Sequence, residues 1–469
     1  MDQAVILAGG QGKRMHTDLP KPLLKVLDEP MLKWVISACK DAGIERICVV
    51  KGYNAEKIDE YLEAEGLDVE TAMQAERLGT GHAVMQAADF IAADTEGSTL
   101  VLCADAPFMD VETIKKSLDY HIKGGNSVTV ITAEIDEPTG YGRILRNNSG
   151  IYGIVEEKDA SPAQKEIKEI NSGAYWFSSA DLPQLLAGLK QNNAQNEYYL
   201  TDTIYAALEK GKKADAFKTE NKSVIYGAND RKGMLELNRI ATEAVLEKHM
   251  ENGVSFVSTD GIIIGRNVKI GAGTEILPGT ILKGNTEIGS DCVIGPNCLI
   301  ENTKVGNKVN LNYVQAYDSV VDDNVKIGPF VQLRPNSHIM EGVKIGDFVE
   351  IKNSTIGKHT AVAHLTYVGD SDVGQKVNFG CGVVTVNYDG QTKARCTIGD
   401  GCFIGCNTNL IAPLKLGKAV YTAAGTTVTR DVPDYALAID RGVMKINEGY
   451  TLRKLKSQIG HSHINKDKK

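Results

Sequence analysis

The chain has 469 residues, of which 42% are hydrophobic and 24% charged, and its formal net charge is −8. This length suits roughly two or three domains with substantial cores, and the apolar content excludes an intrinsically disordered chain. The acidic balance disfavours a general nucleic-acid-binding protein, and the 47 glycines follow no Gly-X-Y period, which excludes collagen.

Residues 1–230 alternate short apolar strands with helical patterns. Strands are expected at residues 4–8, 47–50, 99–103 and 128–132, and a helix at residues 30–42. Such an alternation is typical of a mostly parallel sheet that helices cover on both faces. We therefore predict an α/β Rossmann-like domain over residues 1–230, followed by a helical linker over residues 231–251 with one apolar stripe.

From residue 252 onward an aliphatic side chain recurs every sixth position. The first unbroken run comprises Ile264, Ile270, Ile276, Leu282, Ile288, Ile294 and Ile300, and the register returns at residues 327–351 and 398–416. Small residues two positions earlier and glycines after the aliphatic position fit an inward stack with tight turns. The period predicts a left-handed parallel β-helix of hexapeptide repeats over residues 252–469. Coincidence in a glycine-rich sheet protein is the alternative, and the returning register argues against it.

The nine cysteines form no Cys-x-x-Cys pair and no zinc ligand set, so we expect reduced thiols in a cytoplasmic protein. Residues 4–8 are too short an apolar run for a signal peptide, and no stretch approaches the roughly 20 apolar residues of a membrane span. We expect neither a membrane nor a nucleic-acid partner. The basic tail, residues 452–469, is expected to be a solvated terminus.

The glycine-rich loop at residues 9–12 is a candidate phosphate site. Backbone N–H groups of such a loop bind anions, and the cations Arg14 and Lys21 are suited to neutralise a triphosphate. The alternative is a tight turn without a ligand. The spacing differs from a P-loop, and the GxGxxG pattern of dinucleotide-binding folds is absent.

Further motifs follow this loop in a fixed order. They are residues 74–83 (QAERLGTGHA), 105–107 (DAP), 138–144 (PTGYGRI), 154–159 (IVEEKD), 169–173 (EINSG) and 196–202 (NEYYLTD). Together with the hexapeptide repeats, this set resembles the bacterial bifunctional N-acetylglucosamine-1-phosphate uridylyltransferases/glucosamine-1-phosphate N-acetyltransferases over almost the whole chain. The resemblance implies a nucleotidyltransferase in the first domain, and acetylation of glucosamine-1-phosphate by acetyl-CoA followed by uridylyl transfer from UTP with release of pyrophosphate.

The resemblance also implies site residues in the first domain. They are the nucleotide-lining Leu7, Ala8, Gly9 and Gly10, the phosphate-binding Arg14 and Lys21, the uracil-reading Gln74, Gly79 and Thr80, and the sugar-binding Gly140, Glu156 and Asn171. Asp105 and Asn229 are implied Mg²⁺ ligands, and their hard oxygens suit that ion. In-line attack on the α-phosphorus needs positive charge more than a general base. The alternative for Asp105 is a helix cap.

Four positions depart from the family pattern. Gly9 replaces the usual second Ala, Lys13 the usual Thr and Ala104 the usual Gly, and Pro22 follows the lysine as in related hexose-1-phosphate enzymes. These departures concern nucleotide choice and rate, and the reaction class is unaffected.

In the second domain a cluster of candidate residues lies between residues 334 and 441, partly where the hexad rhythm breaks. His364 lies in such a break, and histidine is suited to general-base catalysis, which contributes roughly 10²–10⁴ in rate. The alternative is a structural histidine. The resemblance implies that His364 deprotonates the 2-amino group. It implies glucosamine-1-phosphate contacts at Arg334, Lys352, Tyr367, Asn378 and Lys393, and acetyl-CoA contacts at Cys381, Asn387, Tyr388, Cys406, Ala424 and Arg441.

Cys381 and Cys406 are interpreted as small pocket-lining residues, because no flanking cation that would activate a nucleophile is evident in the sequence. Hexapeptide helices tend to pack as threefold trimers, so we expect a homotrimer in which Arg334, His364 and Arg441 come from different chains. Two rival functions are a nucleotidyltransferase with a silent regulatory β-helix and a non-catalytic binding subunit. The acetyl-site cluster argues against the first rival, and the phosphate and metal residues argue against the second.

Overall fold

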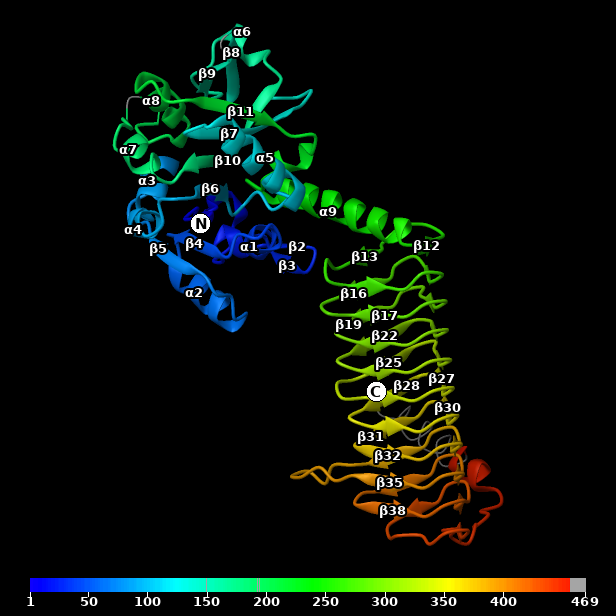
Figure 1. Ribbon diagram of the computed structural model, residues 1–469. Helices are drawn as coiled ribbons and strands as arrows, with labels where there is room; N and C mark the ends of the chain where they lie inside the picture. The colour runs from blue at the N-terminus through cyan, green and yellow to red at the C-terminus, as the bar shows by residue number, and fades with distance from the viewer. Residues whose placement is uncertain (149, 192, 194, 456–469) are drawn as a thin grey trace, which may run out of the picture. The chain divides into compact units, whose positions relative to one another are not determined.

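The computed structural model describes residues 1–148, 150–191, 193 and 195–455 (Figure 1). Most of the predicted basic tail, residues 456–469, lies outside the described residues. The chain divides into two compact units: Met1–Glu251 with Ile263–Asn267, and Asn252–Ile262 with the residues from Val268 onward. Among the described residues, no helix has both the length and the apolar character that a membrane crossing requires.

A nine-stranded sheet forms the centre of the first unit. Its main path runs β11 (Ala214–Lys218), β7 (Val128–Glu134), β10 (Glu169–Ser178), β6 (Ser98–Cys103), β1 (Gln3–Ala8), β4 (Arg46–Lys51) and β5 (Glu70–Met73). The antiparallel pair β8 (Arg143–Asn147) and β9 (Gly150–Val155) joins it at β10. β1 runs parallel to both of its neighbours, whereas β10 is antiparallel to β6 and β7. The predicted strands are therefore found, in a mostly parallel sheet.

Helices cover both faces of this sheet. Alternate residues of β1 enter opposite cores: Ile6 packs with the helices α1, α2 and α5, and Val5 packs with α3, α4, α7 and α8. The bounds are α1 (Met31–Asp41), α2 (Ala55–Ala64), α3 (Thr80–Met85), α4 (Ala88–Ala92), α5 (Val111–Gly124), α6 (Pro162–Lys165), α7 (Leu182–Leu186) and α8 (Thr203–Glu209). Short 3-10 turns η1 (Lys13–Met15), η2 (Lys21–Leu23), η3 (Leu200–Asp202) and η4 (Lys222–Ile225) and the hairpin β2 (Lys25–Val26)–β3 (Glu29–Pro30) complete the unit.

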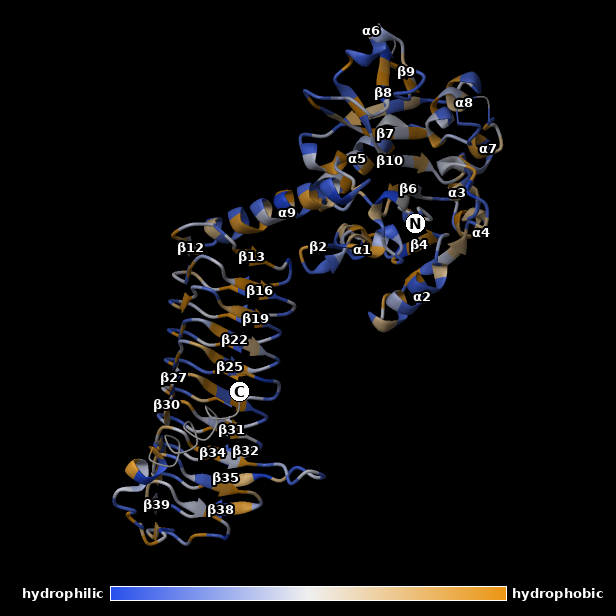
Figure 2. Cartoon of the chain, turned by 180° about the vertical axis from the view of Figure 1, so that it is seen from behind, coloured by the Kyte–Doolittle hydropathy of each residue, from blue (hydrophilic) through white to orange (hydrophobic). Residues whose placement is uncertain are grey.

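The helix α9 (Arg231–Glu251) has an apolar stripe, visible as alternating colours in Figure 2. Met234, Leu237 and Ala241 on this stripe are buried against Met15 and Met31 of the first unit. This packing makes the helix a part of the first unit.

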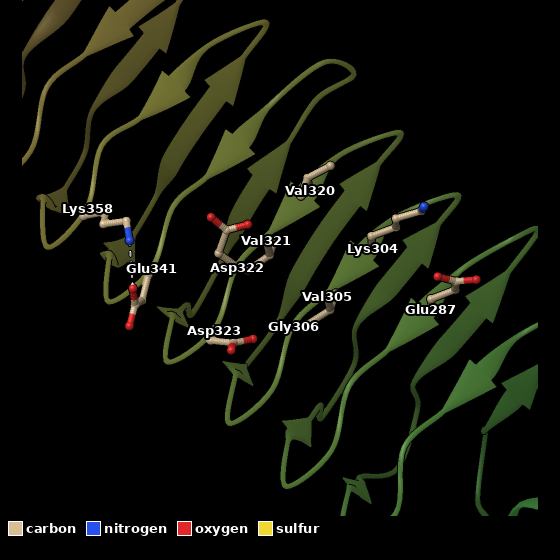
Figure 3. Close-up of a pocket in the computed structure, with 10 residues that line it drawn as sticks. All are labelled: Glu287, Lys304, Val305, Gly306, Val320, Val321, Asp322, Asp323, Glu341 and Lys358. Carbon is tan, nitrogen blue, oxygen red and sulfur yellow. Dashed lines mark hydrogen bonds and ion pairs between the residues drawn. The ribbon is translucent and has the colours of Figure 1, made fainter.

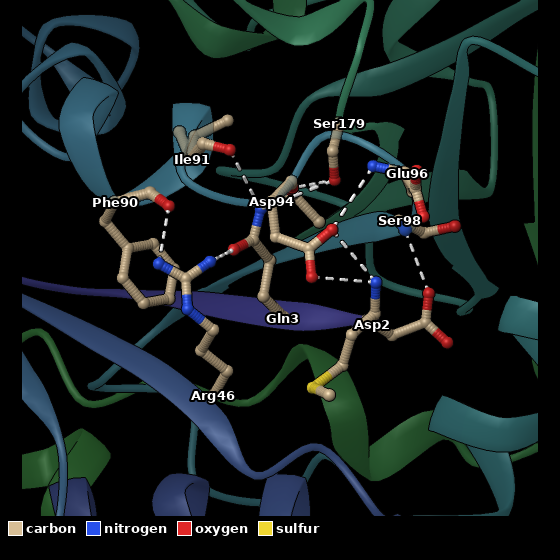
Figure 4. Close-up of polar contacts among 11 residues, drawn as sticks. Asp2, Gln3, Arg46, Phe90, Ile91, Asp94, Glu96, Ser98 and Ser179 are labelled. Carbon is tan, nitrogen blue, oxygen red and sulfur yellow. Dashed lines mark hydrogen bonds and ion pairs between the residues drawn. The ribbon is translucent and has the colours of Figure 1, made fainter.

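A buried polar network fixes the start of β1 (Figure 4). Gln3 is fully buried, and its Nε2 donates to the carbonyl of Asp94 and to Thr99 Oγ1, both at 3.1 Å. Its Oε1 accepts from Arg46, which also donates to the carbonyl of Phe90 at 2.9 Å. Because unpaired buried polar groups cost free energy, the network holds β1 in register, and with it the glycine-rich loop that follows.

The second unit is a left-handed parallel β-helix, and each coil contributes one short strand to each of three sheets. One sheet runs from β12 (Ser255–Phe256) to β41 (Leu437–Ala438), the second includes β16 (Ile281–Lys283) to β40 (Thr427–Val428), and the third runs from β14 (Lys269–Ile270) to β38 (Leu414–Leu416). The predicted fold class is thus confirmed.

The aliphatic stack also explains the irregular stretch of the sequence. Three hexads make one coil, so Leu282 pairs with Ile300, but Ile300 pairs with Ala316, two positions short of a full coil. Leu333 then follows Ala316 in the same inward position, and Ile351 follows Leu333. Shortened coils break the hexad count without breaking the stack.

Candidate functional site

A pocket of about 250 Å³ lies at the carboxyl ends of β1 and β6, where parallel sheets commonly bind ligands. Eight predicted residues line it: Leu7, Gly9, Gly10, Lys21, Gln74, Gly79, Thr80 and Asp105. Pro22, Ala83, Cys103, Arg77 and Glu197 line it as well. The predictions missed Arg77, although it stands within the motif at residues 74–83 and adds a third cation to the loop region.

Two glycines shape this pocket. Gly79 has φ 108°, and an added Cβ would lie 2.6 Å from the carbonyl oxygen of Tyr198. A Cβ on Gly9 would lie 2.8 Å from Oε1 of Gln74, a side chain that is 6% exposed and donates to the carbonyl of Gly79 at 3.1 Å. The departure from Ala at Gly9 therefore fits the position of Gln74.

Lys21, Asp105 and Asn229 meet at the edge of the pocket. Lys21 Nζ forms an ion pair with Asp105 and donates to Asn229 Oδ1 at 3.0 Å. Asp105 does not cap the following helix, because Asp110 does so by accepting from Thr113 N at 2.7 Å. The helix-cap interpretation of Asp105 is therefore wrong.

The predicted sugar residues outside the pocket lining gather around a bulge in β10. Asn171 N donates to the carbonyl of Gly142 at 2.9 Å, and Asn171 Nδ2 donates to Tyr175 OH at 2.6 Å. A Cβ on Gly142 would lie 3.4 Å from both carboxylate oxygens of Glu156. Burial and the nearby Asp159 raise the pKa of Glu156.

The neighbouring Glu157 has the opposite environment. The backbone N–H of Gly140 donates to Glu157 Oε2 at 3.2 Å, and the buried Arg143 lies 2.8 Å from the same oxygen. These two donors lower the pKa of Glu157. Glu156 and Glu157 thus offer a matched pair for testing the charge of this region.

We expect the substitutions Glu156→Gln and Glu157→Gln to change stability in opposite directions at pH 7. A raised carboxyl pKa in the folded state means that ionisation destabilises the fold as pH rises, so Glu156→Gln increases the free energy of unfolding. A lowered pKa means the reverse, so Glu157→Gln decreases it. Both differences shrink on acidification through the carboxyl range. Urea unfolding followed by tryptophan fluorescence is the measurement, because Trp34 and Trp176 both lie in the first unit. Equal signs for the two variants would contradict this assignment.

In the second unit, four predicted residues occupy one column at a corner of successive coils. The backbone hydrogen bonds Leu365 N to Asp347 O, Gly382 N to His364 O, Asn407 N to Cys381 O and Gly425 N to Cys406 O set this register. The column therefore comprises Asp347, His364, Cys381, Cys406 and Ala424. Cys406 is exposed and Cys381 is half-buried.

Asp347 is a member of this column that the sequence predictions missed. His364 Nδ1 lies 2.9 Å from Asp347 Oδ1, and this hydrogen bond lowers the pKa of Asp347. The imidazole is 60% exposed, so its other nitrogen is open to a ligand. Counting one coil back from His364 would have identified Asp347, once the coil length at this point was known.

A cluster of cations lies at another corner of the same coils. Arg334 and Lys352 follow paired residues of β25 (Val331–Leu333) and β28 (Val349–Lys352), so they occupy equivalent positions in successive coils. Lys393, from the inserted loop after β34 (Val384–Val386), contacts Lys352 and lowers the pKa of its amine. Arg334 Nη1 donates to Glu350 Oε1 at 2.9 Å in an ion pair. Lys352 and Lys393 carry like charges that repel each other, and an anion bound between them would relieve this repulsion.

Tyr367 and Asn387 lie beside this cluster. The Asn387 side chain is 8% exposed, and its Nδ2 donates to Tyr367 OH at 3.4 Å and to the buried carboxylate of Asp370. Tyr367 belongs to the strand β31 (Tyr367–Gly369), three residues after His364. The strand therefore joins the histidine column to the cation cluster.

Three predicted residues are not brought into these groups within one chain. Asn378 is exposed on β33 (Asn378–Phe379), Tyr388 is 55% exposed with its hydroxyl bonded to the Gly390 carbonyl at 2.7 Å, and Arg441 lies beyond the last strand. In the described part of the chain, no hydrogen bond or ion pair holds the Arg441 side chain.

Another hollow on the β-helix has a volume of about 500 Å³ and contains none of the predicted residues. Figure 3 draws the side chains that line it. Opposite charges line it, and Lys358 pairs with Glu341 at 3.0 Å. Within the described residues, no group of three His, Cys, Asp or Glu side chains could hold a metal ion.

Comparisons with known proteins agree with this division. A nucleotidyl transferase family model matches residues 3–225, a bacterial transferase hexapeptide model of six repeats matches residues 261–302 and 318–353, and a hexapeptide repeat model of succinyl-transferase matches residues 395–430.

Similar proteins extend over nearly the whole length. One from Acetivibrio thermocellus, named bifunctional protein GlmU, is 46% identical over 452 residues, which cover 96% of this chain and 97% of the relative. Proteins of the same name from Caldanaerobacter subterraneus and Alkaliphilus metalliredigens are 47% and 45% identical, and the matches cover 97% and 96% of this chain and 98% of each relative.

Proposed function

The chain belongs to the GlmU family of bifunctional proteins, and from this membership we propose which unit carries out which reaction. The protein is an enzyme of UDP-N-acetylglucosamine synthesis that acts by acetylation and uridylyl transfer. The second unit acetylates glucosamine-1-phosphate with acetyl-CoA. The first unit transfers the uridylyl group of UTP to the product and releases pyrophosphate. The observation that carries this division is that each unit gathers its own charged cluster, Lys21 with Asp105 in one and Arg334 with Lys352 in the other.

In the first unit, the sugar phosphate oxygen attacks the α-phosphorus of UTP. Backbone N–H groups of the loop at residues 9–12 and the cations Arg14, Lys21 and Arg77 hold the phosphates and offset their charge. Gln74, already fixed by its bond to Gly79, presents its amide to the base. Glu156 and Asn171 bind the sugar. The step needs positive charge and alignment, and no residue here has to act as a general base.

Mg²⁺ is the metal that this site fits. The Asp105 carboxylate and the Asn229 amide oxygen both lie within reach of one ammonium group, so a small cation can contact both. Mg²⁺ is commonly bound by one or two protein oxygens and substrate phosphates, and it keeps several waters. When bound, it supplies further neutralisation of the phosphate charge.

In the second unit, the 2-amino group of glucosamine-1-phosphate attacks the thioester carbon of acetyl-CoA. The hydrogen bond to Asp347 leaves His364 Nε2 as the base that takes the amine proton. A C–N bond forms, the C–S bond breaks, and the departing thiolate recovers a proton from His364. Arg334, Lys352 and Lys393 bind the sugar phosphate, and no metal is needed.

A homotrimer would complete this second site. Tyr313, Phe330 and Phe348 form an exposed column of rings on successive coils, with centroids 5.1 and 5.4 Å apart. Exposed apolar patches of this kind mark interaction surfaces. Val443 and Met444, which are 91% and 81% exposed, stand near Arg441. Packing of subunits against these residues would bring Arg441 to a neighbour's site.

We also place the protein in the cytoplasm. All nine cysteines are free thiols, which suits a reducing compartment. Its ligands are small molecules, and the acidic net charge does not favour nucleic acid.

Two assays on the purified protein test the proposal. Release of CoA thiol from acetyl-CoA and glucosamine-1-phosphate is expected without added metal, and release of pyrophosphate from UTP and N-acetylglucosamine-1-phosphate is expected only with Mg²⁺. A panel of four nucleotides and several sugar phosphates defines the preference. Absence of thiol release would favour a silent β-helix, and absence of both activities would favour a binding subunit.

We expect alkylation of Cys406 to block acetyl transfer and acetyl-CoA to protect against it. Cys406 is exposed in the histidine column, whereas Cys39 and Cys48 are buried, and burial raises the pKa of both to about 12, which makes them poor targets. Iodoacetamide treatment, followed by both assays, is the measurement. The Cys406→Ser variant should retain activity within a few-fold and resist the reagent. A loss of activity in Cys406→Ser as large as in a His364 variant would instead identify a nucleophile.

A further inference from the structure

The ammonium group of Lys21 lies where the two proposed metal ligands meet. Its Nζ donates to Asn229 Oδ1 at 3.0 Å and forms an ion pair with Asp105 Oδ2. Only 8% of the Lys21 side chain is exposed, against 32% of the Asp105 side chain. One cation therefore already satisfies the oxygens that we assign to Mg²⁺.

Local packing holds these groups together. Ala228 N donates to the carbonyl of Asp105 at 3.2 Å, which ties the loops that carry the two ligands to each other. Gly12 has φ 59°, and a Cβ added to it would lie 3.1 Å from Cβ of Lys21. Lys21 thus lies close beside the glycine-rich loop, and it lines the same pocket as Asp105.

We propose that Lys21 excludes the divalent cation from the nucleotide-free protein and releases the ligands when phosphates enter the pocket. This inference rests on the proposed function, because it takes UTP as the ligand of the first unit. One carboxylate and one amide bind Mg²⁺ weakly by themselves, and an ammonium on both oxygens competes with the ion directly. A triphosphate gives Lys21 a more highly charged partner.

The exchange couples the two ligands thermodynamically. If the phosphates draw Lys21 away from Asp105, UTP raises the affinity for the metal, and the metal raises the affinity for UTP by the same factor. Lys21 thereby prevents the site from trapping a cation before the nucleotide arrives. It acts first as a substitute cation and then as a phosphate contact.

Binding of Mn²⁺ to the full chain without nucleotide tests the proposal. Mn²⁺ is a paramagnetic substitute for Mg²⁺, and its free concentration is read directly from its electron spin resonance signal. Lys21→Met is expected to bind Mn²⁺ at the first unit at least tenfold more tightly than the wild type. Lys21→Arg retains a cation that can bridge both oxygens and should bind like the wild type. Lys123→Met removes a paired lysine that contacts a single carboxylate, Asp119, on an exposed helix face, and should also bind like the wild type.

Asp105→Asn is measured alone and combined with Lys21→Met. The difference in Mn²⁺ binding between proteins with and without the Asp105 carboxylate is the binding at this site, without the contribution of other acidic surfaces. The gain from Lys21→Met should disappear in the Asp105→Asn background. An unchanged Mn²⁺ affinity in Lys21→Met, or an equal gain in both backgrounds, would overturn the proposal on Lys21. If Asp105→Asn altered Mn²⁺ binding in no background, including Lys21→Met, the proposed metal ligand itself would be wrong.

A measurement on the wild type keeps the test independent of how the variants fold. Acylation of Lys21 by an amine-reactive reagent, followed by peptide mass mapping, should be slow in the free protein and faster when Mn²⁺ is saturating. Acylation of Lys123, whose partner is the single carboxylate of Asp119, should be unaffected by the metal. A Lys21 rate that does not respond to saturating Mn²⁺ would contradict the exchange.

Discussion

Replacement of His364 by alanine is expected to lower the rate of CoA thiol release by roughly 10²–10⁴, the usual contribution of a general base. Release of pyrophosphate from UTP should remain within about twofold of the wild type, because His364 and the nucleotide pocket lie in different units. The two assays proposed above measure both activities on the same preparation. Intact thiol release in His364→Ala would remove the residue from the mechanism.

A second cross-coil pair provides the control for this experiment. His338 Nε2 lies 3.0 Å from Asp322 Oδ1, and its ring is 40% exposed, so it resembles His364 with Asp347 in contact and exposure. His338 has none of the predicted substrate residues among the groups that line the adjacent hollow. His338→Ala should therefore leave both activities unchanged. Equal losses in the two histidine variants would indicate a shared effect on the β-helix.

Asp347 is expected to act as a positioning residue. In Asp347→Asn an amide that can donate as well as accept replaces the carboxylate, so it no longer fixes which imidazole nitrogen carries the proton. We therefore expect kcat for acetyl transfer to fall while the KM of both substrates changes little. Asp347→Glu should recover part of the rate. A change confined to KM would mean that Asp347 supports substrate binding and not the base.

Replacement of Asp105 by alanine is the other change with a large expected effect. It removes the only carboxylate of the proposed Mg²⁺ site and leaves Lys21 without its ion-pair partner. Loss of preorganised charge stabilisation at a reacting phosphate commonly costs roughly 10²–10³ in rate, so pyrophosphate release should fall by that factor. In a titration with Mg²⁺, the variant should also need a higher Mg²⁺ concentration to reach half of its maximal rate. Acetyl transfer, which needs no metal in our proposal, should be unaffected.

Asp110 is the matched control in the same segment. It caps α5 through Thr113 and accepts from Asn221, so Asp110→Ala should lower the stability of the first unit by about 1 kcal/mol. Its pyrophosphate release should persist below the melting transition. If Asp105→Ala behaved like Asp110→Ala, with lower stability and preserved rate, Asp105 would have a structural role only.

The sequence predicts the fold well because both units rest on strong periodic signals. Apolar strands that alternate with helices require a covered parallel sheet, and an inward side chain at every sixth position leaves little choice but a coil of three short strands. The prediction weakens where a coil is shortened. Ala316 continues the stack after Ile300, yet its place outside the hexad count hides it from a search for aliphatic residues.

The candidate sites are less predictable from the sequence, because their contacts depend on how adjacent coils and loops are placed. Family motifs identify His364 and Lys21, but Asp347 becomes a partner of His364 only through the register of adjacent coils. Likewise, the contact of Lys352 with Lys393 depends on a loop that folds back, which no local pattern specifies. Arg441 lies beyond the last strand, and its place in the acetyl site rests on the trimer that we propose.

The histidine column also sets a length. Parallel strands lie about 4.8 Å apart, so the four steps from Asp347 to Ala424 span about 19 Å along the axis of the coils. Evenly spaced residues along this column suit a long, linear ligand that places its reactive end beside one of them and its remainder along the others. The inserted loop enlarges one coil at another corner, so the sequence can gain residues there without altering the spacing of this column.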